Sequence, residues 1–178
     1  MVIIPPMEST KDFSFGYASN TFYVMAVFPL AIGAAMLYAG TRMSPAALWY
    51  GLGAVTLLVG LALAYNAYAT NHMTLRVTGD ALEVDAPLRK RAVARSEIKL
   101  AEARRVDLTK ETSLVPTHRK NGSDVSGLKE GWWQLKNGEK ALVVVTNPEN
   151  AVYIPTTAGY SLLVTPTDPS SFLTFLRH

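Results

Sequence analysis

Four basic residues in the stretch LRKRAVAR could bind phosphate. If this stretch is a β-strand, Arg89, Arg91 and Arg95 share one face and Lys90 points to the other. Each guanidinium presents a planar fork of hydrogen-bond donors, a geometry that suits phosphate and lipid headgroups. We therefore expect a lipid- or phosphate-binding face here. The alternative is a solvated strand whose charges prevent edge-to-edge aggregation.

A second set of candidates surrounds two adjacent tryptophans, Trp132 and Trp133. Successive side chains of a strand point to opposite faces, so only one of the two can enter a given core. The other indole could anchor a partner, because indoles concentrate binding energy at interfaces. We take Trp132, with Arg119 and Lys120 from the preceding polar segment, as candidate partner-binding residues. The alternative is that both rings are packed.

The sequence argues against several classes of function. There is no cysteine among the 178 residues, and the three histidines have no helical spacing that would chelate a metal. No G-x-S-x-G, H-E-x-x-H or phosphate-cradling glycine loop is present. The formal net charge is only +3, far from the dense basic face of a nucleic-acid binder. We expect no enzyme activity, no catalytic residue, no cofactor, no metal and no nucleic-acid partner.

Two long apolar runs, residues 17–40 and 46–69, each match the ~20 residues that a helix needs to cross a bilayer. Aromatic residues mark their ends, as at membrane interfaces. Small residues recur at a spacing of four, which allows close packing of helices: Ala31, Ala35 and Ala39, Ala47 and Gly51, Gly60 and Ala64. We expect a two-helix transmembrane hairpin over 17–71 after an N-terminal tail over 1–16. A buried hairpin or a cleaved signal peptide fits this pattern less well.

Two spans place the N-terminus and the C-terminal domain on one side of the membrane. The connection between the spans carries one basic residue, Arg42, whereas Lys11, Arg76 and the arginine cluster lie on the other side. The positive-inside rule therefore favours a cytoplasmic domain.

From residue 72 to 178 the hydrophobic pattern changes to that of a β-domain. MTLRVTGDALEVDAPL alternates around a Gly79-Asp80 turn, as half-buried antiparallel strands do. Asn137-Gly138 predicts a hairpin with a two-residue turn, in which Trp133 faces Leu142 and Trp132 faces Val143. We expect residues 109–131 to form a mobile polar loop.

The chain ends in a predicted short helix. Asp168 is placed as its N-cap, Pro169 at its first position, and Phe172, Phe175 and Leu176 form an apolar stripe. The expected domain is a mainly β barrel or sandwich of about seven strands, capped by this C-terminal helix.

This arrangement resembles the pleckstrin-homology (PH) type of fold, and residues 118–177 resemble the membrane-anchored bacterial PH-like domain family. The motif positions are Arg119, Gly127, Gly131, Gly138, Ala141, Ile154, Thr156, Thr165, Pro166, Asp168, Pro169 and Phe172. The resemblance implies a binding or scaffolding module without known catalysis, and most members lack the lipid-binding loop of eukaryotic relatives.

Together these patterns predict a PH-like recognition domain anchored in a bacterial inner membrane. It would hold a protein partner, or copies of itself, at the membrane, while its spans contact lipid. Two alternatives are binding of anionic lipid headgroups through the basic strand and a structural role in a larger membrane complex.

Overall fold

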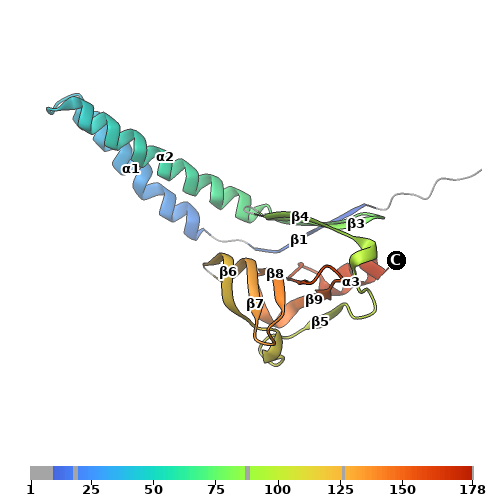
Figure 1. Cartoon of the computed structure of the whole chain (residues 1–178). Coiled ribbons are helices and arrows are strands. Elements are labelled where there is room, and N and C mark those ends of the chain that lie inside the picture. The colour runs from blue at the N-terminus through green and yellow to red at the C-terminus, as the bar shows by residue number, and fades with distance from the viewer. Residues whose placement is uncertain (1–9, 18–19, 87–88, 126, 178) are drawn as a thin grey trace, which may run out of the picture. The chain divides into compact units, whose positions relative to one another are not determined.

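The computed structural model describes residues 10–17, 20–86, 89–125 and 127–177. It divides into two compact units: Ala18–Asn71, and Met1–Tyr17 together with His72–His178 (Figure 1). The first unit is a helical hairpin and the second is a β-domain, and each is described separately below.

The hairpin consists of α1 (Thr21–Gly40) and α2 (Ala46–Asn71). The first helix begins four residues later than the sequence suggested, and the second ends two residues later. By length and composition, both helices are long and apolar enough to cross a membrane.

Small residues at a spacing of seven allow the two helices to pack closely. Gly53, Gly60 and Ala67 are buried on α2, and α1 buries Ala26, Gly33 and Gly40 in the same way. A Cβ added to one of these glycines would meet a large side chain of the other helix: Leu57 at Gly33, Tyr50 at Gly40, Leu37 at Gly53 and Leu30 at Gly60. The seven-residue repeat keeps one seam in contact along both helices, as in a coiled coil.

The predicted spacing of four is therefore not the spacing that joins the helices. Of the residues in those stripes, Gly60 is buried, whereas Ala31, Ala35, Ala47 and Gly51 are exposed in the hairpin.

The β-domain contains ten described strands in two sheets. The four-stranded sheet has the order β1-β2-β3-β4 and the six-stranded sheet the order β5-β9-β10-β8-β7-β6. The strands are β1 (Lys11–Ser14), β2 (Thr74–Val77), β3 (Ala81–Ala86), β4 (Arg89–Ala94), β5 (Arg104–Val106), β6 (Pro116–Val125), β7 (Leu128–Leu135), β8 (Lys140–Val145), β9 (Ala151–Pro155) and β10 (Ser161–Val164). The predicted mainly β domain is confirmed, but it has more strands than expected and does not close into a barrel.

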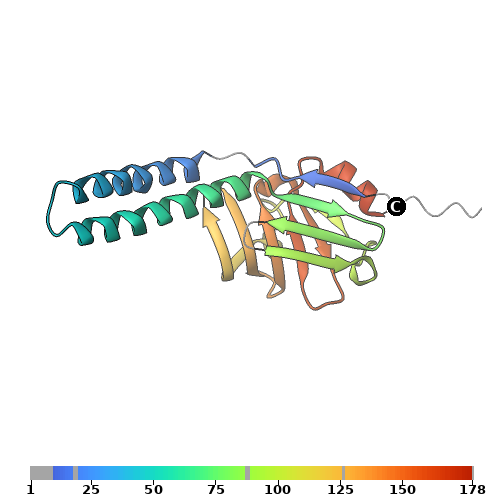
Figure 2. The same cartoon turned by 90° about the horizontal axis from the view of Figure 1, so that it is seen from above.

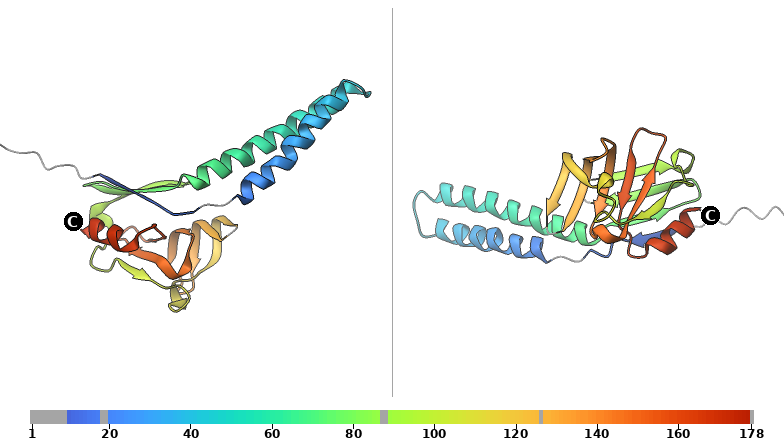
Figure 3. Two further views of the ribbon diagram at one scale, coloured as in Figure 1. Left: turned by 180° about the vertical axis from the view of Figure 1, so that it is seen from behind. Right: turned by 90° about the horizontal axis from the view of Figure 1, so that it is seen from below.

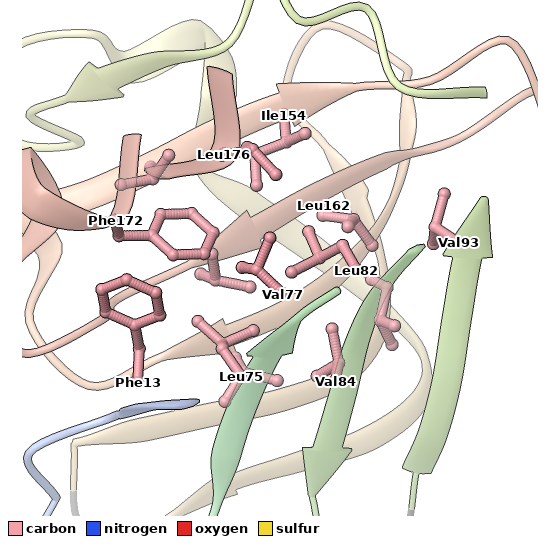
Figure 4. Packing of buried hydrophobic residues seen from close by; sticks show 14 of the residues in the cluster. Phe13, Leu75, Val77, Leu82, Val84, Val93, Ile154, Leu162, Phe172 and Leu176 are labelled. Atoms are coloured by element: carbon pink, nitrogen blue, oxygen red, sulfur yellow. The ribbon is translucent and has the colours of Figure 1, made fainter. Parts of the chain in front are cut away.

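The two sheets lie face to face with the main core between them (Figures 2 and 3). Alternate residues of β3, among them Leu82 and Val84, point into this core, as do Leu162 and Ile154 from the opposite sheet (Figure 4). All pairs of neighbouring strands are antiparallel except β8 and β10, which are parallel.

The first strand comes from the segment before the hairpin. β1 pairs antiparallel with β2, so that Phe13 lies opposite Leu75. Phe13 is 8% exposed, and its ring meets that of Phe172 edge-on, with centroids 5.2 Å apart (Figure 4). Burying a phenylalanine contributes roughly 1.5–3 kcal/mol. A segment that the sequence suggested to be a tail thus supplies both a strand and a core residue.

The C-terminal helix α3 (Pro169–Arg177) forms as predicted. The Asp168 carboxylate accepts hydrogen bonds from the backbone N–H groups of Ser170 and Ser171, at 3.1 and 3.0 Å. A further bond from the Ser171 hydroxyl, together with these, lowers the pKa of Asp168. Phe172 and Leu176 enter the core between the sheets.

Two predictions about the middle of the domain are wrong. Residues 116–125 form β6 instead of a loop, because they pair along β7 despite their polar character. The following hairpin is shifted by one residue, with Trp132 opposite Leu142 and Trp133 opposite Ala141. The reason is a three-residue turn, in which Gly138 has φ +89° and the backbone N–H of Leu135 donates a hydrogen bond to the carbonyl of Glu139.

We expect Gly53→Leu to destabilise the hairpin, because a Cβ there would lie 2.8 Å from the Leu37 side chain. Overpacking of this kind costs about 1–3 kcal/mol. The measurement is the thermal midpoint of helical circular dichroism for the full chain in detergent. Gly51→Leu is the matched control, since nothing lies within 4 Å of a Cβ at that position. Equal loss of stability in both variants would show that this seam does not join the helices.

Candidate functional site

The basic stretch at β4 does not form one row of arginines. The strand ends at Ala94, and Arg95 begins a 3-10 turn, η1 (Arg95–Glu97). There Arg95 donates a 2.7 Å hydrogen bond to the carbonyl of Leu176, at the end of α3. Lys90 forms an ion pair with Asp85 at 2.9 Å. Arg89 begins the strand opposite Ala86. A headgroup site on this stretch stays a hypothesis, and a ligand there would compete with these contacts.

Arg91 lies opposite Val84, on the side of β4 that faces the other sheet. Its Nε donates a 3.3 Å hydrogen bond to the Tyr160 hydroxyl, and its guanidinium carbon is 5.7 Å from the centre of that ring. The hydrogen bond raises the pKa of Arg91 above its ordinary value. Arg91 is thus held against an aromatic surface at the edge of the sandwich.

Tyr160 connects Arg91 to Trp132. The rings of Tyr160 and Trp132 meet edge-on, with centroids 5.1 Å apart and planes at 82°. The Lys140 ammonium lies over the Trp132 ring, 4.3 Å from its centroid. We call Arg91, Tyr160, Trp132 and Lys140 the cation–aromatic stack. It brings together two residues that the sequence suggested for different sites, Arg91 and Trp132.

The two tryptophans have different surroundings, as predicted. Trp132 is half-buried at the margin of the core between the sheets. Trp133 is 4% exposed and packs in a second core on the outer face of the six-stranded sheet, where its indole N–H donates to the carbonyl of Glu130. Trp132 is the more exposed of the two indoles, but its ring also packs against the core and lies beneath the Lys140 ammonium, which is close to the alternative that both rings are packed.

A cavity of about 440 Å³ lies between β6, β7 and the start of β8, and Trp132 is not among the residues that line it. It is lined by Lys120, Trp133, Gln134, Gly138 and Lys140. These residues present two ammonium groups and an amide but no carboxylate. Lys140 therefore belongs both to the stack and to the cavity.

Four cations on β6, in the turn after β7 and at the start of β8 have no carboxylate partner in the part of the chain that the structure describes: Arg119, Lys120, Lys136 and Lys140. We call these residues the basic patch. Six other cations are matched by an acid, in the pairs Arg76–Asp12, Lys90–Asp85, Lys99–Glu102, Arg104–Glu111, Lys110–Asp107 and Lys129–Asp124. Arg91, Arg95, Arg105 and Arg177 have no acid partner among the described residues either, but each donates a hydrogen bond to a hydroxyl, carbonyl or amide oxygen.

The acid nearest in sequence to the patch is held by other groups. Glu139 accepts hydrogen bonds from the Tyr153 hydroxyl at 2.9 and 3.1 Å and from the Asn137 amide at 3.4 Å. Burial, and then the bond to Glu139, raises the pKa of Tyr153 to about 12. The Tyr153 hydroxyl therefore remains protonated and donates its hydrogen bond to Glu139 throughout the physiological pH range.

Trp132, Arg119 and Lys120 stay candidate partner-binding residues, and Tyr160 and Lys140 were not among the predicted ones. Lys140 was missed with the hairpin register: the three-residue turn places it opposite Gln134, two residues from Trp132 on the same face. Tyr160 has no comparable local signal, since its contacts come from strands distant in the sequence.

A comparison with family models bears directly on this domain. The bacterial PH domain model matches residues 73–178, more than half of the chain. The chain belongs to the bacterial PH domain family. No curated protein and no solved structure was found to match it. The matched region of this bacterial PH domain contains the stack and the patch but neither β1 nor the hairpin. Membership supports a binding or scaffolding module and does not specify a ligand.

We expect acrylamide to quench Trp132 more strongly than Trp133, because only Trp132 is partly open to solvent. The measurement compares two single-tryptophan proteins, each with Trp49 and one of the pair replaced by phenylalanine. Lys140→Ala should increase the quenching of Trp132 further, since the ammonium group covers that ring. Equal quenching of the two indoles would contradict an accessible Trp132.

Proposed function

We propose that this bacterial PH domain is a non-catalytic recognition module that holds a protein partner, or a second copy of the chain, at a membrane. One observation carries the proposal: the half-buried Trp132 lies beneath the Lys140 ammonium, which also lines a cavity with Lys120, and the basic patch has no carboxylate partner among the described residues. Aromatic rings and basic groups around a hollow are typical of binding surfaces.

Anchoring in the membrane is supported by the surface of the hairpin. Only 17% of the apolar window in α1 and 11% of that in α2 is buried. All exposed large hydrophobic residues in the described part of the chain lie between residues 23 and 68. A helix from the core of a soluble protein would bury such residues, whereas a transmembrane helix turns them toward lipid.

The proposed location is a bacterial inner membrane with the N-terminus and the β-domain in the cytoplasm. The pairing of β1 with β2 supports a common side for the N-terminal segment and the β-domain, because the chain before α1 and the chain after α2 join one sheet. The orientation itself rests on the positive-inside rule applied to Arg42 on the connection and to Lys11 and Arg76 on the other side.

A protein partner is favoured over headgroup binding through the β4 stretch. The basic residues of the β4 stretch that would form a headgroup site are partly engaged, with Lys90 on Asp85 and Arg95 on α3. A structural subunit would need surfaces for foreign helices. The seam glycines Gly33, Gly40, Gly53 and Gly60 are used within the hairpin, but the small residues Ala31, Ala35, Ala47 and Gly51 are exposed and leave this alternative open.

Site-specific photocrosslinking in living bacteria tests the proposal. We expect a photoreactive residue at His118, which is exposed on β6, to form a discrete adduct with a protein. Mass spectrometry then distinguishes a foreign protein from a second copy. Position 110 is the control, because Lys110 is equally exposed but ion-paired with Asp107. The adduct should disappear in Lys120→Glu/Lys140→Glu. Lipid adducts alone, or the same products at both positions, would contradict the proposed function.

A further inference from the structure

The partner's chemistry can be narrowed, an inference that rests on the proposed function. We infer that an extended acidic segment of a different protein binds along β6, adds to the six-stranded sheet as a further strand, and places its carboxylates on the basic patch.

The backbone of β6 provides the template. This strand lies at the end of the strand order, and its described pairing is with β7 on one side only. Its residues Thr117–Asn121 are all exposed. An edge strand offers a row of N–H and C=O groups that an extended peptide can satisfy, which supplies affinity without reading a sequence.

The side chains along β6 select the charge of that peptide. Arg119 and Lys120 project from the exposed part of the strand, and Lys140 shares the adjoining cavity with Lys120. The other end of β6 is different, since Asp124 is already paired with Lys129. Carboxylates of a bound strand would therefore find free cations only at the basic end, which fixes the register.

The same features disfavour a second copy of β6 as the occupant. Two such strands would bring Arg119 and Lys120 of one copy close to those of the other, and like charges across a strand pair are destabilising. The strand also contains irregularities between Pro116 and His118 and between Arg119 and Asn121. These irregularities affect a second copy and a foreign strand alike, whereas the lysine and arginine protect the edge against self-pairing in particular. An acidic foreign strand removes the repulsion and gains charge-assisted hydrogen bonds.

The cavity beside β6 fits this occupant better than a flat surface would. It has a volume of about 440 Å³, and its lining includes Lys120, Lys140 and Gln134, whose amide donates one hydrogen bond to the carbonyl of Gly138 at 3.3 Å. An acidic side chain entering it would meet two cations and an amide donor, while its aliphatic part contacts apolar atoms of the wall. Trp132 lies on the same strand as Gln134 and offers its ring to the next residue of the peptide on that face.

The test uses the full-length protein in nanodiscs of phosphatidylcholine, because β1 makes the N-terminal segment part of the domain. The probe is a fluorescent dodecapeptide in which Glu and Thr alternate, and binding is followed by anisotropy. One comparison peptide replaces Glu by Gln and removes the charge. Another replaces Thr by Pro and removes N–H donors needed for strand pairing.

We expect the Glu–Thr peptide to bind, more weakly as salt is raised, and both comparison peptides to bind at least about tenfold more weakly. Lys120→Ala/Lys140→Ala should weaken Glu–Thr binding about tenfold, since it removes two charge-assisted contacts. Lys99→Ala/Lys110→Ala is the matched control, in which two exposed lysines with acidic neighbours are lost. The control should change affinity by less than about twofold.

Several results would overturn the inference: no binding of the Glu–Thr peptide, equal binding of all three peptides, or equal effects of the two double variants. Loss of peptide binding when phosphatidylglycerol is added to the nanodisc would also overturn it, because the lipid headgroups would then occupy the basic patch. If the peptide fails while the adduct at position 118 persists, the acidic strand is wrong and the recognition function stands. If both fail, the recognition function is wrong as well.

Discussion

The antiparallel pairing of β1 with β2 is the constraint on which the rest of the architecture depends. These strands lie immediately before and after the helical hairpin, and four residue pairs, from Lys11 with Val77 to Ser14 with Thr74, join them. The chain before the hairpin and the chain after it thus join one sheet, so both ends of the hairpin lead to one side of any membrane that it crosses. It also places Phe13 against Phe172 and Phe175 of α3. The domain consequently includes residues from both sides of the hairpin in sequence.

The distribution of charge connects this scaffold to its proposed role. Ion pairs within the domain neutralise many of its cations at exposed positions, where each pair contributes little to stability. Around β6 and the turn after β7 the cations have no such partners, and Tyr153 holds Glu139 away from them. Charges of this kind add nothing to the fold by themselves, but they attract and orient an acidic partner. Confinement to a membrane would raise the effective concentration of any partner anchored in the same surface.

The sequence predicted the parts of the fold that depend on local patterns. The apolar helices, the capped helix at Asp168 and the opposite faces of Trp132 and Trp133 follow from composition, capping and the two-residue period of a strand. The missed parts depend on distant partners: β1 forms because β2 is beside it, and β6 because β7 is. The hairpin register failed by one residue because Asn137-Gly138 fits both a two-residue and a three-residue turn. For the site, the candidates Trp132, Arg119 and Lys120 came from residue type and stay candidates, whereas Tyr160 enters only through the tertiary structure.

The central claim is that the hairpin crosses a membrane while β1 and the β-domain share one side of it. The chain contains no cysteine, so single cysteines at Thr10, Met43 and Lys110 can report sidedness with a membrane-impermeant maleimide. Met43 lies between the two helices, Thr10 before β1 and Lys110 in the β-domain. We predict that Met43→Cys is labelled in intact spheroplasts, whereas Thr10→Cys and Lys110→Cys are labelled only after lysis. Labelling of Met43→Cys and Lys110→Cys from the same side would contradict the account.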